Sequence, residues 1–300
     1  MPPEDQAKGE HVALYSVLKT LGGPLMQGIY HPWVRGAENI PKEGPAILAS
    51  NHNAVWDSIF LPMVIDREVA FMGKADYFTG TGVKGWATKN FMKAVGTIPV
   101  DRSGGKAAQA AMQAGLDRLN SGQLFGIYPE GTRSPDGRLY KGKTGVARLA
   151  LESGAPVLPV AMIGTHAAQP IGQKLPSRTN IGVVIGEPLD FSRYRAVAKD
   201  RYVLRAVTDE IMYALMQLSG QEYVDRYAAD VKAELAAKGE FDGPIPNSAK
   251  APGGRPVPDT EVPVAPTPEE LEILNAAEDS GPDGLSAVEI QAEPEEKSDE

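Results

Sequence analysis

A histidine and an aspartate five residues apart, His52 and Asp57, follow the short apolar run 46–49. Five residues of α-helix rotate by about 500°, which leaves the two side chains roughly 140° apart, so a single helix would separate them. A turn after a strand could bring them together. The Asp57 carboxylate would then accept the Nδ1 proton of His52 and leave Nε2 free to take a proton from a hydroxyl. The spacing predicts a general base with its orienting carboxylate, although it also arises by accident about 0.2 times in such a chain.

A second polar stretch, residues 96–106, runs from a strand-like segment into a predicted helix. Free backbone N–H groups at the start of a helix, beside Arg102 and Lys106, form a site that suits an anion such as phosphate. A plain strand-to-helix turn with Ser103 as N-cap is the alternative.

A third stretch, residues 128–134, follows another predicted strand. Arg133 offers a forked donor for phosphate, Gly131 lets the backbone approach a ligand closely, and Glu130 can accept from a hydroxyl. Three polar turns that each follow a strand are typical of a site in an α/β sheet, although each could be only a turn. A fourth stretch, 155–161, is an apolar strand with two prolines, which favour a sheet edge or the wall of a site. Taken alone, the stretch is better explained as a core strand.

Short apolar runs alternate with longer helical segments, which is the pattern of an α/β domain. The predicted strands are 46–49, 69–72, 97–100, 124–128, 157–162 and 181–185. The predicted helices are 57–65, 106–119, 144–152 and 201–218, with a further helix over 222–237. Gly122 and Gly154 favour helix ends just before them. The sequence therefore predicts a mixed central sheet flanked by helices.

Together and in this order, the four stretches resemble the four motifs of the glycerolipid acyltransferase family, most closely the bacterial 1-acylglycerol-3-phosphate acyltransferases. The resemblance covers roughly residues 30–190. The motifs correspond to Asn51 and His52 with Asp57, then to residues 96–102, 129–133 and 157–160. Tyr128 stands where phenylalanine is usual, and Pro99 lies within the second motif; neither departure removes a functional side chain.

The resemblance implies that His52, oriented by Asp57, deprotonates an acceptor hydroxyl that attacks an acyl thioester directly, without an acyl-enzyme. It also implies that the phosphate and glycerol portion of the acceptor is held by Arg102 and by the third motif. The residues of that motif expected to bind the substrate are Glu130, Gly131, Thr132 and Arg133.

The predicted reaction transfers a fatty acyl group from acyl-CoA or acyl-ACP to 1-acylglycerol-3-phosphate (lysophosphatidate), giving phosphatidate in phospholipid biosynthesis. Glycerol 3-phosphate, or another lysolipid or glycolipid, is the alternative acceptor. Acyl carrier protein is a possible partner, and we expect no metal, no cofactor and no nucleic acid.

Two short matches indicate other classes of protein. Residues 137–144 satisfy the P-loop pattern of a phosphotransferase, but the nearest predicted strand ends about nine residues earlier, so the required strand-to-loop context is missing. The basic side chains Arg138, Lys141 and Lys143 remain candidates for anion contact. Residues 80–85 match G-x-G-x-x-G without a preceding strand, which favours a turn. A noncatalytic lipid-binding module is a further alternative.

Charge is unevenly distributed along the chain. Residues 251–300 hold fourteen acidic residues, two basic residues and eight prolines, a net charge of −12, so we expect a disordered tail. Since the whole chain carries −9, residues 1–250 carry about +3 and are mildly basic. The chain has no cysteine, which excludes disulfides and thiolate chemistry.

The most membrane-like segment, residues 12–33, is interrupted after about ten residues, whereas a membrane span needs about 20. It predicts an amphipathic helical segment at the cytoplasmic face of the cell membrane, in a peripheral or monotopic protein, with an ordinary core helix as the alternative. We therefore expect three parts: the N-terminal amphipathic segment (1–35), an acyltransferase domain (36–240) and an acidic, proline-rich disordered tail (241–300).

Overall fold

The computed structural model describes residues 20, 23–24, 26–94, 96–100, 105–173 and 175–243, all of which lie in one compact unit. Arg102, most of the predicted N-terminal segment and nearly all of the predicted acidic tail lie outside the described residues. Residues 26–30 of the N-terminal segment are helical, and the chain then enters a strand.

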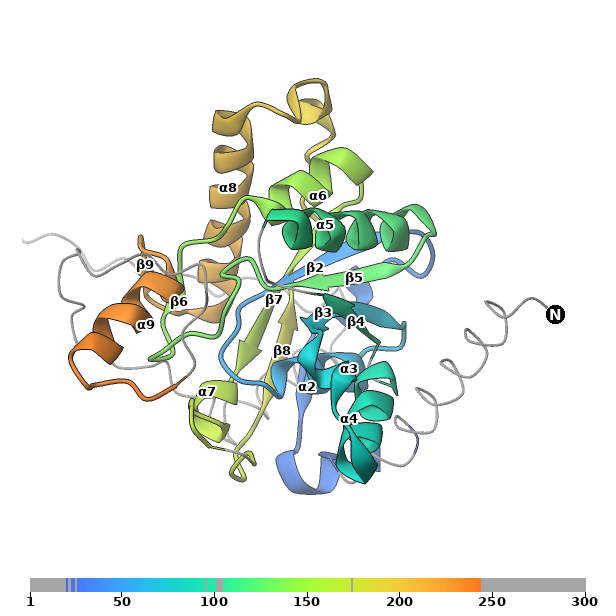
Figure 1. Ribbon diagram of the computed structural model, residues 1–300. Coiled ribbons are helices and arrows are strands. Elements are labelled where there is room, and N and C mark those ends of the chain that lie inside the picture. The colour runs from blue at the N-terminus through green and yellow to red at the C-terminus, as the bar shows by residue number, and fades with distance from the viewer. Residues whose placement is uncertain are drawn as a thin grey trace, which may run out of the picture. The chain divides into compact units, whose positions relative to one another are not determined.

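A seven-stranded mixed sheet forms the centre of this unit, in the order β1-β8-β7-β2-β5-β3-β4 (Figure 1). Neighbouring strands are parallel, except for β7 and β8. The strands are β1 (Trp33–Arg35), β2 (Ala46–Ser50), β3 (Val69–Lys74), β4 (Thr97–Val100), β5 (Leu124–Ile127), β7 (Val157–Ile163) and β8 (Gly182–Ile185). Because β7, β2, β5, β3 and β4 run in parallel, their carboxyl ends lie at one end of the sheet, where the polar turns of the sequence follow them.

Helices cover both faces of the sheet (Figure 1). Helices α5, α6 and α8 pack on one face, and α2 and α7 pack on the other together with residues 26–30. The helices are α2 (Asp57–Val64), α3 (Asp76–Thr79), α4 (Gly82–Ala94), α5 (Gly105–Asn120), α6 (Gly145–Ser153), α7 (Thr165–Ala168), α8 (Arg201–Ser219) and α9 (Ala228–Ala237), with 3-10 turns at Ala37–Asn39 and Ser192–Val197.

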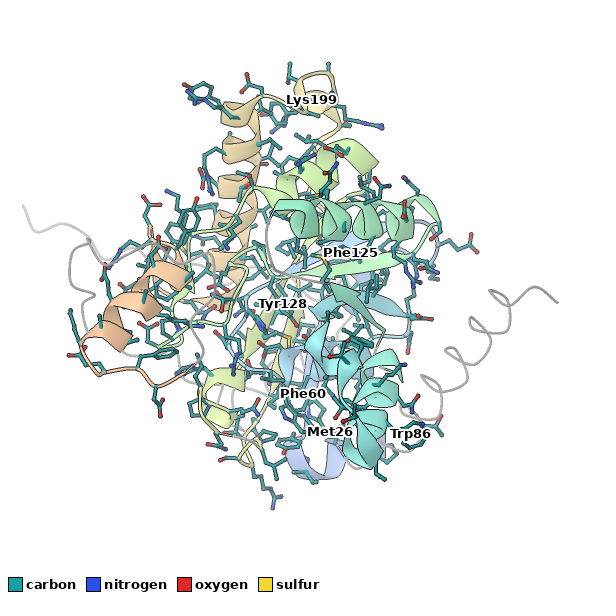
Figure 2. The ribbon with its side chains drawn as sticks, viewed as in Figure 1. Met26, Phe60, Trp86, Phe125, Tyr128 and Lys199 are labelled. Carbon is teal, nitrogen blue, oxygen red and sulfur yellow. The ribbon has the colours of Figure 1, made fainter. Side chains whose placement is uncertain are left out.

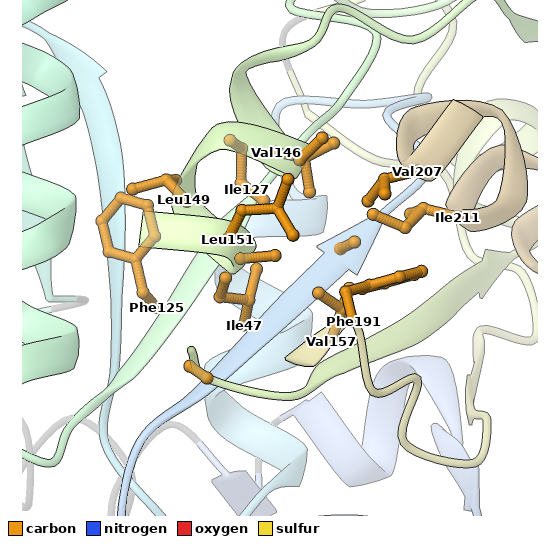
Figure 3. Close-up of a cluster of buried hydrophobic side chains, with 14 of the residues drawn as sticks. Ile47, Phe125, Ile127, Val146, Leu149, Leu151, Val157, Phe191, Val207 and Ile211 are labelled. Carbon is orange, nitrogen blue, oxygen red and sulfur yellow. The ribbon is translucent and has the colours of Figure 1, made fainter. Parts of the chain in front are cut away.

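The sheet separates two hydrophobic cores because successive side chains of a strand point to opposite faces. In β2, Ile47 and Ala49 face the core under α5, α6 and α8, whereas Ala46 and Leu48 face the other core. Figure 3 shows the first core, with Ile47 and Phe125 of adjacent strands beneath α6. A strand that is covered on both faces is apolar throughout, which is why β2 shows no alternation in its sequence.

A smaller two-stranded sheet follows the turn after β5. Its strands, β6 (Leu139–Tyr140) and β9 (Tyr223–Val224), are parallel, and α9 packs against them. The buried ring of Tyr140 contacts Ala228 and Val231 of α9. This packing brings α9 to the turn that carries the third motif.

The six predicted strands are all confirmed as strands of the central sheet, with ends that differ by at most two residues. The sequence does not predict β1, β6 and β9, because strands of two or three residues are too short to show a periodic pattern. It also misses α3, α4 and α7. The last predicted helix, 222–237, begins only at Ala228, since Tyr223–Val224 forms β9.

The fourth motif forms a core strand, as its apolar sequence favours, because β7 is buried and lies between β8 and β2. The edge position that its prolines allow is not taken. Val157 bridges to Leu189 and regular pairing with β8 begins at Val160, so Pro159 lies at a break in that ladder, where its missing N–H costs no bond. Residues 80–85 do not form a simple turn, because α4 begins at Gly82.

Candidate active site

His52 and Asp57 come together at the carboxyl end of β2. The strand ends at Ser50, the chain turns, and α2 begins at Asp57. Nδ1 of His52 lies 3.0 Å from Oδ2 of Asp57. The same oxygen accepts the backbone N–H groups of Asn53 and Ala54 at 2.7 and 2.8 Å, so the carboxylate also fixes the turn that carries the histidine. The predicted strand-turn-helix arrangement is confirmed.

The contact with Asp57 determines which nitrogen of His52 is protonated. An ionised carboxylate only accepts hydrogen bonds, so Nδ1 carries the proton and Nε2 keeps its lone pair. The His52 side chain is 17% exposed, whereas that of Asp57 is fully buried. Burial lowers the pKa of His52 below its ordinary value of 6.5 against the opposing effect of Asp57, and the charges of Arg133 and Lys232 lower it further. The imidazole is therefore neutral at neutral pH and able to accept a proton.

Tyr128, directly after β5, supports the face of the imidazole. The rings of Tyr128 and His52 stack with centroids 3.8 Å apart and planes inclined by 12°. The Tyr128 hydroxyl lies 2.8 Å from Oγ of Ser58 in α2, and the Phe71 ring of β3 lies 5.6 Å from the tyrosine ring. In Figure 2, Tyr128 lies in the middle of the molecule, near the ends of the strands. The tyrosine hydroxyl has a partner, so this site accommodates the departure from phenylalanine.

Glu130 uses both carboxyl oxygens to hold the backbone. Its two carboxyl oxygens accept the backbone N–H groups of His52 and Tyr140, both at 2.9 Å, and the residue is 1% exposed. The interpretation of Glu130 as an acceptor for a substrate hydroxyl is therefore corrected: the carboxyl joins the turn after β2 to β6. Burial raises the pKa of Glu130 to about 8 in spite of these two donors.

Gly131, Thr132 and Arg133 form the accessible part of the same turn. Gly131 has a φ of +72°, a left-handed conformation that glycine adopts without strain, and a Cβ at this position would lie 3.1 Å from the side chain of Lys143. The charge of Arg133 lowers the pKa of His52, and the backbone N–H of the next residue, Ser134, donates to the His52 carbonyl at 2.6 Å. The turns that carry His52 and Arg133 therefore adjoin, and a role of Arg133 in binding stays a prediction.

Lys232 of α9 reaches this turn as well, although it lies outside the four motifs. Its Nζ donates to Oγ1 of Thr132 at 3.0 Å, and the residue is 1% exposed. A signal was present in the sequence: at helical spacing, Lys232 shares a face with Ala228, Val231 and Leu235, so a lysine interrupts an otherwise apolar face.

Asn51 joins the turn after β2 to β7. Its Oδ1 accepts the backbone N–H of Met162 at 2.7 Å, and its Nδ2 donates to the Met162 carbonyl at 3.1 Å and to Oε1 of Gln221 at 2.7 Å. Gln221 in turn donates to Oδ1 of Asn53 and to the carbonyl of Gly137. A buried amide network thus joins the first motif to the end of β7, two residues after the fourth motif. Gln221 gives no local sequence signal, because a single glutamine after a helix has no pattern.

The P-loop-like segment does not form a phosphate cradle. Residues 139–140 form β6, and the N–H groups of Leu139 and Lys141 donate to carbonyls of the chain at and around β9. Arg138 is buried and paired with Asp136 at 2.6 Å, and Lys141 lies 2.6 Å from Asp225, so these two side chains are not the anion contacts considered above. Lys143 stays a candidate, since its side chain passes over Gly131.

Arg102 lies beyond the described residues, so its position relative to Arg133 stays a prediction. Within the described part of the chain, no three histidine or acidic side chains gather in a group that could hold a metal ion. Nor does any helix there have the length and hydrophobicity needed to cross a membrane.

Residues 31–163 match the family described as Acyltransferase. This range contains all four motifs and therefore the His52–Asp57 pair. The resemblance drawn from the four motifs is therefore confirmed over this part of the chain.

Individual proteins give a closer comparison. The chain is 30% identical over 162 residues to the chloroplastic 1-acyl-sn-glycerol-3-phosphate acyltransferase LPAT1 of Arabidopsis thaliana, covering 53% of this chain and 44% of that protein. It is 26% identical over 191 residues to the 1-acyl-sn-glycerol-3-phosphate acyltransferase of Bacillus subtilis, covering 63% of this chain and 88% of that protein. The match thus spans less than half the length of the plant relative.

The fold is similar to the crystal structure of the 1-acyl-sn-glycerophosphate acyltransferase PlsC from Thermotoga maritima. The TM-score is 0.54 at 22% sequence identity, over 74% of this chain and 85% of that chain. This similarity supports the α/β architecture with its mixed sheet.

Proposed function

We propose that the protein is an O-acyltransferase that moves a fatty acyl group from acyl-CoA or acyl-ACP to the free hydroxyl of 1-acylglycerol-3-phosphate, giving phosphatidate for phospholipid biosynthesis. The observation that carries this proposal is the His52–Asp57 pair, which presents a neutral imidazole beside Arg133 at the carboxyl ends of parallel strands. The relatives named as 1-acyl-sn-glycerol-3-phosphate acyltransferases support the choice of acceptor.

His52 is the proposed general base and Asp57 its positioning residue. Nε2 takes the proton of the acceptor hydroxyl while the oxygen attacks the thioester carbonyl; the C–O bond forms, the C–S bond breaks, and the imidazolium returns the proton to the leaving thiolate. Asp57 keeps Nδ1 protonated and stabilises the transient imidazolium. A base of this kind contributes about 10²- to 10⁴-fold, and positioning of the two substrates supplies the remainder.

The proposed headgroup site lies in the turn after β5. Arg133 provides two parallel N–H donors for a phosphate, and Gly131 allows the backbone to approach it. Thr132 adds a hydroxyl. Arg102, two residues after the last residue of β4 in the sequence, is the proposed second guanidinium for this phosphate. Glu130 serves the site by holding the backbone of His52.

Contact with a membrane surface follows from an acceptor that resides in a bilayer. On α4, Val83 and Trp86 are 84% and 68% exposed, and Trp86 projects at the periphery of the molecule (Figure 2). Exposed tryptophan on a helix is suited to the headgroup region of a lipid surface. We propose that this helix, together with the N-terminal segment, seats a peripheral enzyme on the cytoplasmic leaflet.

Vesicle co-sedimentation tests this seating with the double variant Val83→Ser/Trp86→Ser. The matched control is Tyr202→Ser, which removes an equally exposed aromatic side chain from α8. We expect weaker binding to vesicles that contain anionic lipid for the α4 variant alone. Equal binding of all three proteins would rule out α4 as a membrane contact.

Thiol release from acyl-CoA tests the proposed reaction. The acceptors are lysophosphatidate, glycerol 3-phosphate and lysophosphatidylcholine, and the product is identified by mass spectrometry. We expect acceptor-dependent release with lysophosphatidate and phosphatidate as product. Preference for another acceptor would correct the substrate, and binding of lysophosphatidate without thiol release from either acyl-CoA or acyl-ACP would indicate a lipid-binding module.

A further inference from the structure

Lys232 is a buried cation in direct contact with the third motif. It lies on the apolar face of α9, is 1% exposed, and donates from Nζ to the hydroxyl of Thr132 at 3.0 Å. Its charge also lowers the pKa of His52. A helix far along the chain thus supplies a charge to the site formed by the turns after β2 and β5.

No carboxylate among the described residues forms an ion pair with this ammonium. Of its three N–H donors, one is used by Thr132, and the ring of Phe241 lies 5.8 Å from Nζ. The acid that acts on it, Glu130, already accepts two backbone N–H groups. By contrast, Arg226 in the same region is paired with Glu234. Burying a cation without a counter-charge costs free energy, and a bound anion would offset that cost.

The surroundings of Lys232 are rich in positive charge. Burial and the neighbouring Arg133 lower the pKa of Lys232 to about 8, and Glu130 opposes this shift. Burial also raises the pKa of Glu130 to about 8, so this carboxyl carries little negative charge at neutral pH. A bound anion would supply the counter-charge that Lys232 lacks among the described residues.

We propose that Lys232 is a phosphate-binding residue of the acceptor site, where its ammonium and the Arg133 guanidinium together bind the phosphomonoester of the lysophospholipid. The inference rests on the proposed function and adds to it a cation from α9. It also gives a physical reason for selecting a phosphomonoester. Such a group carries up to two negative charges, whereas the phosphodiester of a lysophospholipid with an esterified headgroup carries one.

Steady-state kinetics with three variants tests the inference. Lys232→Met removes the charge and keeps an apolar stem, Lys232→Arg keeps the charge, and Lys238→Met is the matched control at the exposed end of the same helix. We expect Lys232→Met to raise the KM for lysophosphatidate, and the inhibition constant of inorganic phosphate, by about 10- to 100-fold. The KM for acyl-CoA stays near that of the wild type. Lys232→Arg retains most of the affinity, and Lys238→Met changes neither constant.

The pH dependence separates binding from a purely structural role. The charged groups that face Lys232 are Glu130 and Arg133 from the turn after β5, while Glu234 of its own helix is engaged by Arg226. As pH rises through about 8, free Lys232 loses its proton, so the KM for lysophosphatidate of the wild type should rise more steeply than that of Lys232→Arg.

The possible failures are distinguishable. If the wild-type protein releases thiol with lysophosphatidate but Lys232→Met leaves its KM and the phosphate inhibition unchanged, the role of Lys232 is wrong while the proposed function stands. If no phosphate-bearing acceptor supports thiol release by the wild type, the proposed function fails first. Should Lys232→Met not fold, as judged by circular dichroism, the inhibition constants and pH profiles of wild type and Lys232→Arg decide the matter, and identical profiles overturn the inference.

Discussion

In the turn after β2, three donors converge on one oxygen of Asp57, and Nε2 of His52 is left without a role in holding the fold. In the segment 137–144 the opposite holds: the backbone N–H groups of Leu139, Tyr140 and Lys143 all donate to the protein itself. Both segments match short sequence patterns that are associated with chemistry.

The difference between these segments lies in what remains available to a substrate. The internal bonds of the turn after β2 restrain a side chain but spare its reactive atom, whereas those of segment 137–144 consume the donors that a phosphate would need. A motif match therefore indicates a site only when the fold leaves the relevant atoms uncommitted. Replacing His52 in the first segment and Lys143 in the second tests this difference.

His52→Ala should have the largest effect. Without the base, kcat/KM for lysophosphatidate should fall by about 10²- to 10⁴-fold, because the hydroxyl proton has no acceptor. Lys143→Ala, in the P-loop-like segment, should cost much less. Thiol release measured with both variants checks the pair, and a loss of activity in Lys143→Ala with normal activity in His52→Ala would reverse the comparison.

Asp57→Asn should have the next largest effect. An asparagine amide no longer requires a proton on Nδ1 of His52, so the ring can adopt the tautomer that blocks Nε2, and it loses the charge that stabilises the imidazolium. We expect a loss of kcat of about 10³-fold and little further loss when His52→Ala is added, since the two residues act as a unit. Fully additive losses in the double variant would show that they act separately.

Arg133→Lys tests the proposed binding of phosphate by the turn after β5. The change keeps the positive charge but removes the forked pair of donors, so the KM for lysophosphatidate should rise about tenfold with a small change in kcat. Arg148→Lys is the control, because Arg148 is half exposed and lies in an ion pair along α6. An unchanged KM would place the phosphate elsewhere.

Glu130→Gln should have the smallest effect on activity and a clear effect on stability. Burial raises the pKa of Glu130 from 4.5 to about 8. Its stabilising contribution is therefore complete below pH 4.5 and is lost as pH rises to about 8. The free energy of unfolding of the wild type should fall across this window, relative to Glu130→Gln, by on the order of a few kcal/mol. Urea denaturation at pH 5 and pH 8.5 measures this; a difference between the two proteins that does not change with pH would contradict the assignment.

The sequence predicts the central sheet well because its strands are continuous apolar runs bounded by polar turns. It also predicts the contact between His52 and Asp57, since a local turn of five residues determines it. Such features depend on neighbours in the chain. The short strand β6 and the helix α9 owe their positions to packing against each other, which no local pattern records.

The role of Glu130 shows where a sequence interpretation is incomplete. Its residue type predicts an acceptor, and it is one, but for backbone N–H groups from two different segments. Lys232 shows the converse: its contact with Thr132 spans 100 residues, and only its place on an apolar helix face hints at burial. Long-range polar contacts of this kind emerge only when the elements are packed together.

The tautomer of His52 tests the central claim most directly. Long-range ¹⁵N–¹H spectra of the protein labelled at histidine, with the His52 signals assigned by comparison with His52→Ala, report which ring nitrogen is protonated at pH 7. We predict a neutral imidazole with the proton on Nδ1 and a bare Nε2. A proton on Nε2, or a doubly protonated ring at this pH, would contradict a base held ready by Asp57.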